Sequence, residues 1–132
     1  MLPEGLQYQS IKSIVNKVSN LGANVVRLTY AIEMIDDIYS YNPNSTLQNT
    51  LIHALGTANG TRLLKQILKK NPQFTPYTTR LEVFDAVAAE CARQQIYVHL
   101  DNHVSKAIWC CGHTDGNAWF GMTSTLVAFV SH

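Results

Sequence analysis

The sequence predicts an α/β domain with a parallel sheet. Short segments rich in β-branched residues, bounded by turn signals, predict strands. Apolar residues at helical spacing predict helices on either side of them. The resulting order is helix, strand, several helices, strand, and strands that alternate with helices in this way favour parallel pairing.

The first half of the chain supplies a helix, a strand and a second helix. Apolar side chains recur at helical spacing over residues 11–21, and Gly22 follows as a natural C-cap. Residues 24–30, with the sequence Asn-Val-Val-Arg-Leu-Thr-Tyr, predict a short strand. A second helical pattern covers residues 31–39 and ends at the turn signal of residues 42–45.

The middle of the chain is predicted to be helical and interrupted by glycine. Residues 46–70 favour two short helices, broken at Gly56 and again at Asn59 and Gly60. Residues 71–76, which contain two prolines, are predicted to form a linker after these helices.

A capping box opens the last predicted helix. The Thr79 hydroxyl and the Glu82 carboxylate can each accept from the other residue's backbone N–H group. This helix places four apolar residues on one face: Phe84, Val87, Ala88 and Cys91.

A strand is predicted over residues 96–101 after this helix, and a long polar loop follows the strand.

Composition narrows the classes of protein to consider. The chain has 132 residues, enough for one modest core, and only 14% are charged where about a quarter is usual. We therefore expect further protein to cover much of the surface. A net charge of +1 provides no basic field for nucleic acid, no apolar run approaches the ~20 residues of a membrane span, and no signal peptide is visible.

Cysteines and glycosylation sequons leave the compartment open. Cys91, Cys110 and Cys111 suit neither a disulfide framework nor a paired zinc site, and their pairing stays open. The sequons at Asn44 and Asn59 permit glycosylation if the protein is secreted.

Polar side chains gather where the two predicted strands end. Arg27 and Thr29 lie near the end of the first strand, and residues 99–103 lie at the end of the second. Binding groups in parallel α/β sheets collect at the carboxyl ends of strands. Arg27, a charge inside an apolar strand, is either a partnered structural cation or a functional group.

The second cluster allows a metal site. His99, Asp101 and His103 alternate, so a continuing strand would place all three on one face, where they suit a divalent ion. His113 and Asp115 could add ligands from the loop. In the alternative, His99 is a hydrogen-bonded interior residue, and Asp101 and His103 only shape the turn.

The loop after the second strand allows a sugar site instead. Trp109 and Trp119 flank Asp115, Gly116 and Asn117. Aromatic faces can stack on sugar rings while carboxylate and amide groups bind the hydroxyls. In the alternative, both tryptophans pack the loop against the rest of the domain.

Four segments carry a resemblance to a known family. Residues 5–14 read Gly-Leu-Gln-Tyr-Gln-Ser-Ile-Lys-Ser-Ile, residues 21–30 hold the first strand, and residues 83–103 end in Val-His-Leu-Asp-Asn-His. The loop with Trp-Cys-Cys-Gly and Asp-Gly-Asn-Ala-Trp extends the likeness over residues 3–121. These segments resemble a fungal branch of glycoside hydrolase family 5, the cellulase-like (β/α)8 barrels.

The resemblance implies a partial TIM (β/α)8 barrel. Residues 1–121 would form the N-terminal part of the catalytic domain, roughly the second and third barrel strands with their adjacent helices. Residues 122–132 are expected to be a divergent apolar tail, the product of truncation or mis-splicing. The implied protein is a secreted retaining β-glycosidase or endoglucanase without a cofactor, hydrolysing O-glycosyl bonds in a polysaccharide whose linkage stays open.

The resemblance also implies roles for single residues. Arg27 would lie beside the catalytic nucleophile, and His103 would line the subsite of the scissile sugar. Trp119 would be a sugar platform. His99, Asp101 and Asn102 would support this site without binding metal.

Neither catalytic glutamate of the family is expected in this chain. The family's acid/base glutamate follows an asparagine, and the sequence holds no Asn-Glu dipeptide, so both glutamates are expected downstream. We therefore expect the isolated chain to be inactive and to self-associate through open sheet edges, with no nucleic-acid or membrane partner. The alternatives are a metal-dependent hydrolase using His99, Asp101 and His103, and a non-catalytic carbohydrate-binding protein.

Overall fold

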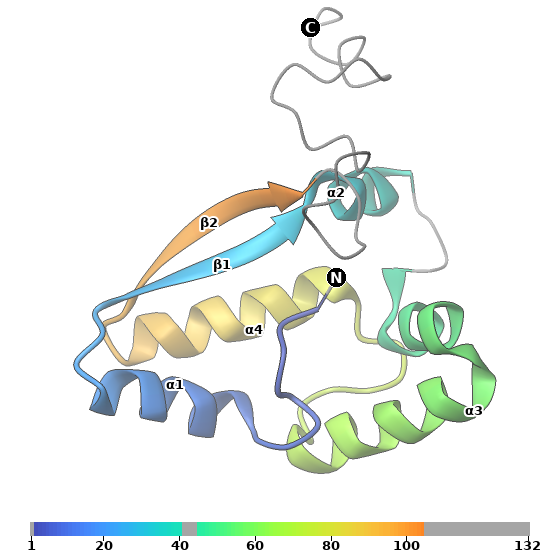
Figure 1. Cartoon of the computed structure of the whole chain (residues 1–132), viewed down its shortest axis with the longest axis horizontal. Coiled ribbons are helices and arrows are strands. Elements are labelled where there is room, and N and C mark those ends of the chain that lie inside the picture. Colours follow the sequence, from blue (N-terminus) through green and yellow to red (C-terminus); the bar gives the residue numbers. More distant parts are fainter. Residues whose placement is uncertain (1, 41–44, 105–132) are drawn as a thin grey trace, which may run out of the picture.

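The computed structural model describes residues 2–40 and 45–104, and its elements follow the predicted order. No helix in these two ranges is long and apolar enough to cross a membrane. The elements are α1 (Ile11–Asn20), β1 (Val25–Ala31), α2 (Ile32–Tyr39), α3 (Leu47–Lys70), α4 (Arg80–Arg93) and β2 (Tyr97–Val104) (Figure 1).

The two strands pair in parallel, as the alternation of elements predicts. Register runs without a gap from Val25 opposite Tyr97 to Tyr30 opposite Asn102. Ala31 then pairs with Val104, so one residue of β2 is left over and forms a β-bulge. Helices α1 and α4 both lie on the same side of this small sheet, and α1 packs against α4 (Figure 1).

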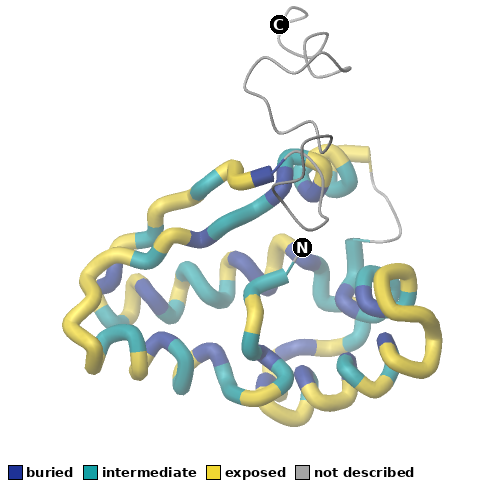
Figure 2. The backbone as a smooth tube through the Cα atoms, in the orientation of Figure 1, coloured by how far each residue is buried: buried dark blue, intermediate teal, exposed yellow. Residues whose placement is uncertain are grey.

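The main core lies between that face of the sheet and the helices. It joins the N-terminal loop to α1, α3, α4 and the start of β2, and Val26 and Val98 pack against it from the sheet. A second, smaller cluster of Leu28, Met34 and Phe84 joins β1 to α2 and α4. Buried residues accordingly line the inner sides of the elements in Figure 2. The main core consists of Leu6, Ile11, Val15, Leu47, Leu51, Leu64, Ile67, Phe74, Val83, Cys91 and Ile96.

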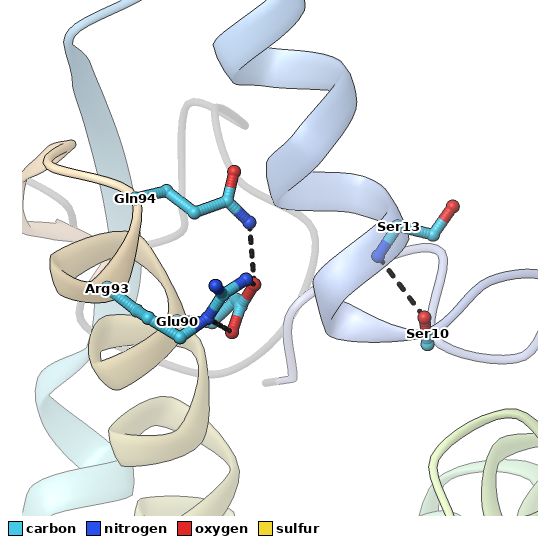
Figure 3. Close-up of polar contacts among 5 residues, drawn as sticks. All are labelled: Ser10, Ser13, Glu90, Arg93 and Gln94. Atoms are coloured by element: carbon cyan, nitrogen blue, oxygen red, sulfur yellow. Dashed lines mark hydrogen bonds and ion pairs between the residues drawn. The ribbon is translucent and has the colours of Figure 1, made fainter.

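Local capping signals set both ends of α1. The Ser10 hydroxyl accepts from the backbone N–H of Ser13 at 3.2 Å (Figure 3). Gly22 has φ +81°, the left-handed conformation that the predicted C-cap requires. The apolar stripe is shorter than predicted, because Leu21 is exposed.

Helix α3 contains the predicted break at Gly56, where φ is +76°. The second predicted break is wrong, because Asn59 and Gly60 are helical. Gly60 serves a different purpose. A Cβ atom there would lie 2.6 Å from the carbonyl oxygen of Leu51 and 2.7 Å from the backbone of Ile52, so only glycine lets the two halves of α3 pack this closely.

Asn71, predicted to begin a linker, is a fully buried connection between segments. Its Oδ1 accepts from the backbone N–H of Ile11 at 2.9 Å. Its Nδ2 donates to the carbonyl of Leu6 at 2.9 Å and also lies 3.3 Å from the carbonyls of Gln9 and Ile67. One amide therefore ties the end of α3 to the loop that enters α1.

The start of α4 combines the predicted capping box with an ion pair that sequence reasoning missed. Thr79 N–H donates to Glu82 Oε2 at 2.7 Å, and Glu82 N–H donates to Thr79 Oγ1 at 3.3 Å, which confirms the capping box. The buried Arg80 donates through Nη2 to Asp37 Oδ2 at 2.6 Å. This pair attaches the first turn of α4 to α2.

The end of α4 carries a second charged group of contacts. Arg93 Nε and Gln94 Nε2 both donate to the Glu90 carboxylate (Figure 3), at 2.8 and 2.6 Å. The Arg93 hydrogen bonds are the main cause that lowers the pKa of Glu90 to about 2. Cys91 beside it is a buried free thiol whose pKa is raised by burial, whereas Cys110 and Cys111 lie outside the described residues.

Candidate functional site

The face of the sheet opposite the helices carries the polar residues. Successive side chains of a strand point to opposite faces, and Val26 and Val98 pack toward the helices. Their neighbours Arg27 and His99 stand opposite each other in the register and therefore share the other face.

Three side chains from the two strands meet on this open face. Arg27 Nε lies 2.9 Å from Asp101 Oδ2. Arg27 Nη2 lies 3.0 Å from His103 Nδ1, and that nitrogen is also 3.0 Å from Asp101 Oδ2. We call Arg27, Asp101 and His103 the strand-end cluster, because Asp101 and His103 lie near the carboxyl end of β2.

The contact between Asp101 and His103 joins residues two apart on β2. In a regular strand such residues are separated by roughly 6.6 Å along the chain and point to the same face, so an imidazole and a carboxylate there can reach each other. His103 is the residue that the register leaves unpaired, between Asn102 and Val104. Bulges bend the strand and change the direction of a side chain, which fits the 3.0 Å contact here.

The strand-end cluster is accessible to solvent, so its contribution to the free energy of unfolding is small. The side chains of Arg27, Asp101 and His103 are 58%, 24% and 37% exposed. Ion pairs this accessible contribute about 0–1 kcal/mol to the free energy of unfolding. Arg27 is thus a partnered cation, as one interpretation of the sequence required. Because its side chain is mostly exposed and the ion pair adds little stability, the pairing gives no structural reason for a charge in this strand.

The geometry of the described side chains does not support the metal interpretation. Within residues 2–40 and 45–104, no group of three His, Cys, Asp or Glu side chains is arranged to hold a metal ion. His99, Asp101 and His103 therefore do not form the site that the metal-dependent hydrolase alternative needed, and the carboxylate of Asp101 is bound by the Arg27 guanidinium instead. The further candidate ligands His113 and Asp115 lie outside the described residues.

The other predicted site residues are not described in contact with the strand-end cluster. His99 shares the open face with Arg27, and its side chain is exposed. Asn102 pairs with Tyr30, is exposed, and makes no described hydrogen bond to the strand-end cluster. Trp119 and Trp109 fall outside the described residues.

Two hollows lie away from the strand-end cluster. One, of about 490 Å³, lies between the N-terminal loop and α3 and includes Tyr8, Asn59 and Arg62 in its lining. The other, of about 680 Å³, runs between the end of α4 and the start of β2, with Ala88, Ala92 and Val98 in its lining. The second hollow is lined mainly by apolar side chains, with Gln95 also in its lining, and lies beside a strand of the sheet.

Sequence reasoning named each member of the cluster but not their contacts. The signal that was missed is that the opposite charges of Arg27 and Asp101 lie on the same face of two neighbouring strands. Thr29 and Asp101 pair across the sheet, which places Arg27 next to Asp101 on the open face once the register is known.

Comparison with known proteins gives one informative similarity. A protein from Chamaecyparis obtusa named "Glycosyl hydrolase 5 family protein" is 37% identical over 120 residues, which cover 91% of this chain and 20% of that protein. The chain therefore spans about a fifth of the length of this curated relative. No family model matches the chain, and no solved structure matches it. The similarity suggests a glycoside hydrolase and does not specify an activity.

Proposed function

We propose that this chain is part of a glycoside hydrolase that cleaves O-glycosyl bonds in a polysaccharide, and that the strand-end cluster forms one wall of its sugar cleft. The observation that carries the proposal is the meeting of Arg27, Asp101 and His103 on the open face of two adjacent parallel strands. Active sites of (β/α)8 enzymes lie at the carboxyl ends of their strands. The similarity to a glycosyl hydrolase 5 family protein supports the same reaction class.

The proposal includes the barrel. We take β1 and β2 as the second and third of eight parallel strands, with the polar face toward the barrel interior. Support comes from the parallel register, from helices on a single face, and from apolar side chains left exposed on β2, where Tyr97 and Leu100 are 76% and 64% exposed. A closed barrel removes such edges, because each strand then has two neighbours.

The proposed reaction needs two carboxyl groups, about 5–5.5 Å apart for retention of configuration. One attacks the anomeric carbon and the other protonates the leaving oxygen. We propose that both are glutamates beyond residues 1–132, because the sequence has no Asn-Glu dipeptide and Asp101 is already bound by Arg27. The 132-residue chain alone is then expected to cleave nothing.

Within that reaction, the residues of this chain bind and orient. Arg27 Nε binds Asp101 and Nη2 lies 3.0 Å from His103 Nδ1, and a guanidinium has further N–H donors that can hold the nucleophile in its ionised form. His103 would hydrogen-bond a sugar hydroxyl, and Trp119 would stack on a sugar ring. The proposal also includes secretion, with which the sequons at Asn44 and Asn59 are compatible.

The test uses the longest open reading frame that contains these residues. Its product is assayed for reducing sugar released from β-1,4-, β-1,3- and β-1,6-glucans. We expect cleavage of at least one, and a loss of roughly 10²–10³-fold in kcat for Arg27→Met, the scale seen when a group stabilising the transition state is removed. Arg62→Met, on the exposed side of α3, is the matched control and should keep full activity.

The outcomes separate the alternatives. A product with no Asn-Glu sequence that binds oligosaccharides without cutting them would replace the hydrolase with a non-catalytic carbohydrate-binding protein. Equal activity of Arg27→Met and Arg62→Met would remove the strand-end cluster from the cleft. His103→Gln, compared with His53→Gln on α3, repeats the comparison for the imidazole.

A further inference from the structure

Two contacts compete for one nitrogen in the strand-end cluster. His103 Nδ1 lies 3.0 Å from Arg27 Nη2, which can only donate a hydrogen bond. The same nitrogen lies 3.0 Å from Asp101 Oδ2, which as a carboxylate can only accept. An imidazole nitrogen carries either a hydrogen or a lone pair in the ring plane, so Nδ1 can satisfy one of these partners at a time.

The surroundings favour Asp101. Asp101 is attached two residues away on the same strand and is only 24% exposed, so its oxygen has less freedom than Arg27 Nη2 to exchange Nδ1 for water. Arg27 is 58% exposed, and its Nη2 can bind water while Nε keeps its 2.9 Å contact with Asp101. If Nδ1 kept a lone pair, that lone pair would face the carboxylate lone pairs with no hydrogen between them.

We propose that Asp101 is a positioning residue that holds His103 in the Nδ1–H tautomer and so leaves Nε2 as a hydrogen-bond acceptor. The same tautomer releases Arg27 Nη2 for another acceptor. Orientation of a histidine by a carboxylate bonded to one ring nitrogen is a general way to fix the role of the other nitrogen.

The consequence for the ligand rests on the proposed function. An accepting Nε2 selects a group that donates, which on a sugar is a hydroxyl. A deoxy sugar that lacks this hydroxyl would leave Nε2 unpaired and bind more weakly. His99 and Tyr97 share the open face, and within the described residues the hydrogen-bond partners of Nδ1 are Arg27 and Asp101.

The tautomer is measured directly in the 132-residue chain, labelled with ¹⁵N-histidine. Long-range ¹H–¹⁵N spectra, at a pH high enough that the rings no longer titrate, distinguish protonated from unprotonated ring nitrogens. His103→Gln identifies the His103 signals by their loss. If the chain self-associates, the same distinction is made by magic-angle-spinning NMR.

We expect Nδ1 to be protonated and Nε2 unprotonated in the wild type. Asp101→Ala should reverse the tautomer, because Nδ1 then accepts from Arg27 Nη2. Asn102→Ala, the neighbouring control, and Arg27→Gln should both keep the Nδ1–H form. A wild type with mainly Nε2–H, or an Asp101→Ala variant with an unchanged tautomer, would overturn the proposal.

No sugar takes part in this measurement. A failed cleavage assay therefore leaves the tautomer assignment standing, and a failed tautomer assignment leaves the proposed hydrolase standing. The wild-type spectrum alone tests the proposal if Asp101→Ala does not fold.

Discussion

Replacing Asn71 tests how the N-terminal loop is attached to the rest of the fold. Asn71→Ala removes the acceptor of the Ile11 N–H group and the donor to the Leu6 carbonyl, both at 2.9 Å. The Ile67 carbonyl keeps its bond to the backbone N–H of residue 71, at 2.8 Å. Two buried backbone groups therefore lose their described partner.

The size of the effect follows from those two groups. Each buried polar group left without a partner costs about 1–3 kcal/mol, and water entering the small space would recover part of this. We expect Asn71→Ala to lower the free energy of unfolding by about 2–4 kcal/mol, a large fraction of the ~5–15 kcal/mol of an ordinary domain.

Asn71→Asp adds a signature that depends on pH. A carboxylate would keep an acceptor for Ile11 N–H but place its second oxygen where Nδ2 now lies, 2.9 Å from the Leu6 carbonyl oxygen. Burial and this repulsion would raise the pKa of the new carboxyl above its unfolded value of about 3.9. The folded variant then binds more protons than the unfolded one, so its stability falls as pH rises through the folded pKa and recovers toward about pH 5.

Urea unfolding followed by circular dichroism, at about pH 7 and pH 5, measures both effects. Asn16 is exposed on α1, so Asn16→Ala and Asn16→Asp are matched controls expected to change stability by less than about 0.5 kcal/mol. The reasoning fails if Asn71→Ala behaves like Asn16→Ala, or if acid does not stabilise Asn71→Asp relative to Asn16→Asp.

Three further predictions concern other contacts. Gly60→Ala should lower the free energy of unfolding by about 1–3 kcal/mol in the same urea assay, because its Cβ would meet the Leu51 carbonyl oxygen at 2.6 Å; an unchanged midpoint would contradict this. Glu90 has a pKa lowered to about 2, mainly by Arg93, so its contribution is present above about pH 4.3 and is lost as pH falls toward 2; Glu90→Gln should flatten the fall of Tm over that interval, and parallel curves would count against it. Leu100, 64% exposed on a strand with an open edge, should promote self-association, so Leu100→Lys should lower the weight-average mass in sedimentation, while an equal mass would exclude this surface.

Signals that lie within a few residues were read correctly from the sequence. The Thr79–Glu82 capping box and the Gly22 C-cap depend on backbone groups at most a few positions away. The parallel pairing of the strands also followed, because the intervening helices return the chain in the same direction. The closed barrel stays a prediction.

Features that depend on distant partners were misread or missed. Asn71 looked like the start of a linker because asparagine before proline is typical of turns, yet its partners Leu6 and Ile11 lie 65 and 60 positions away. The strand β2 was predicted to end at residue 101 and continues to Val104. A polar sequence favours a loop, whereas pairing with Tyr30 and Ala31 keeps these residues in the sheet.

The candidate site divides in the same way. The sequence by itself identified the candidate residues of the site, since an arginine and an Asp-x-His pattern at strand ends are readable from residue types and period alone. Only the tertiary structure decided that Arg27 and His103, 76 positions apart, converge on one carboxylate and do not form a metal site with His99. The physical reason is that a side chain's period fixes its face of the strand, whereas register and the β-bulge fix its neighbours, and both are set by pairing between distant segments.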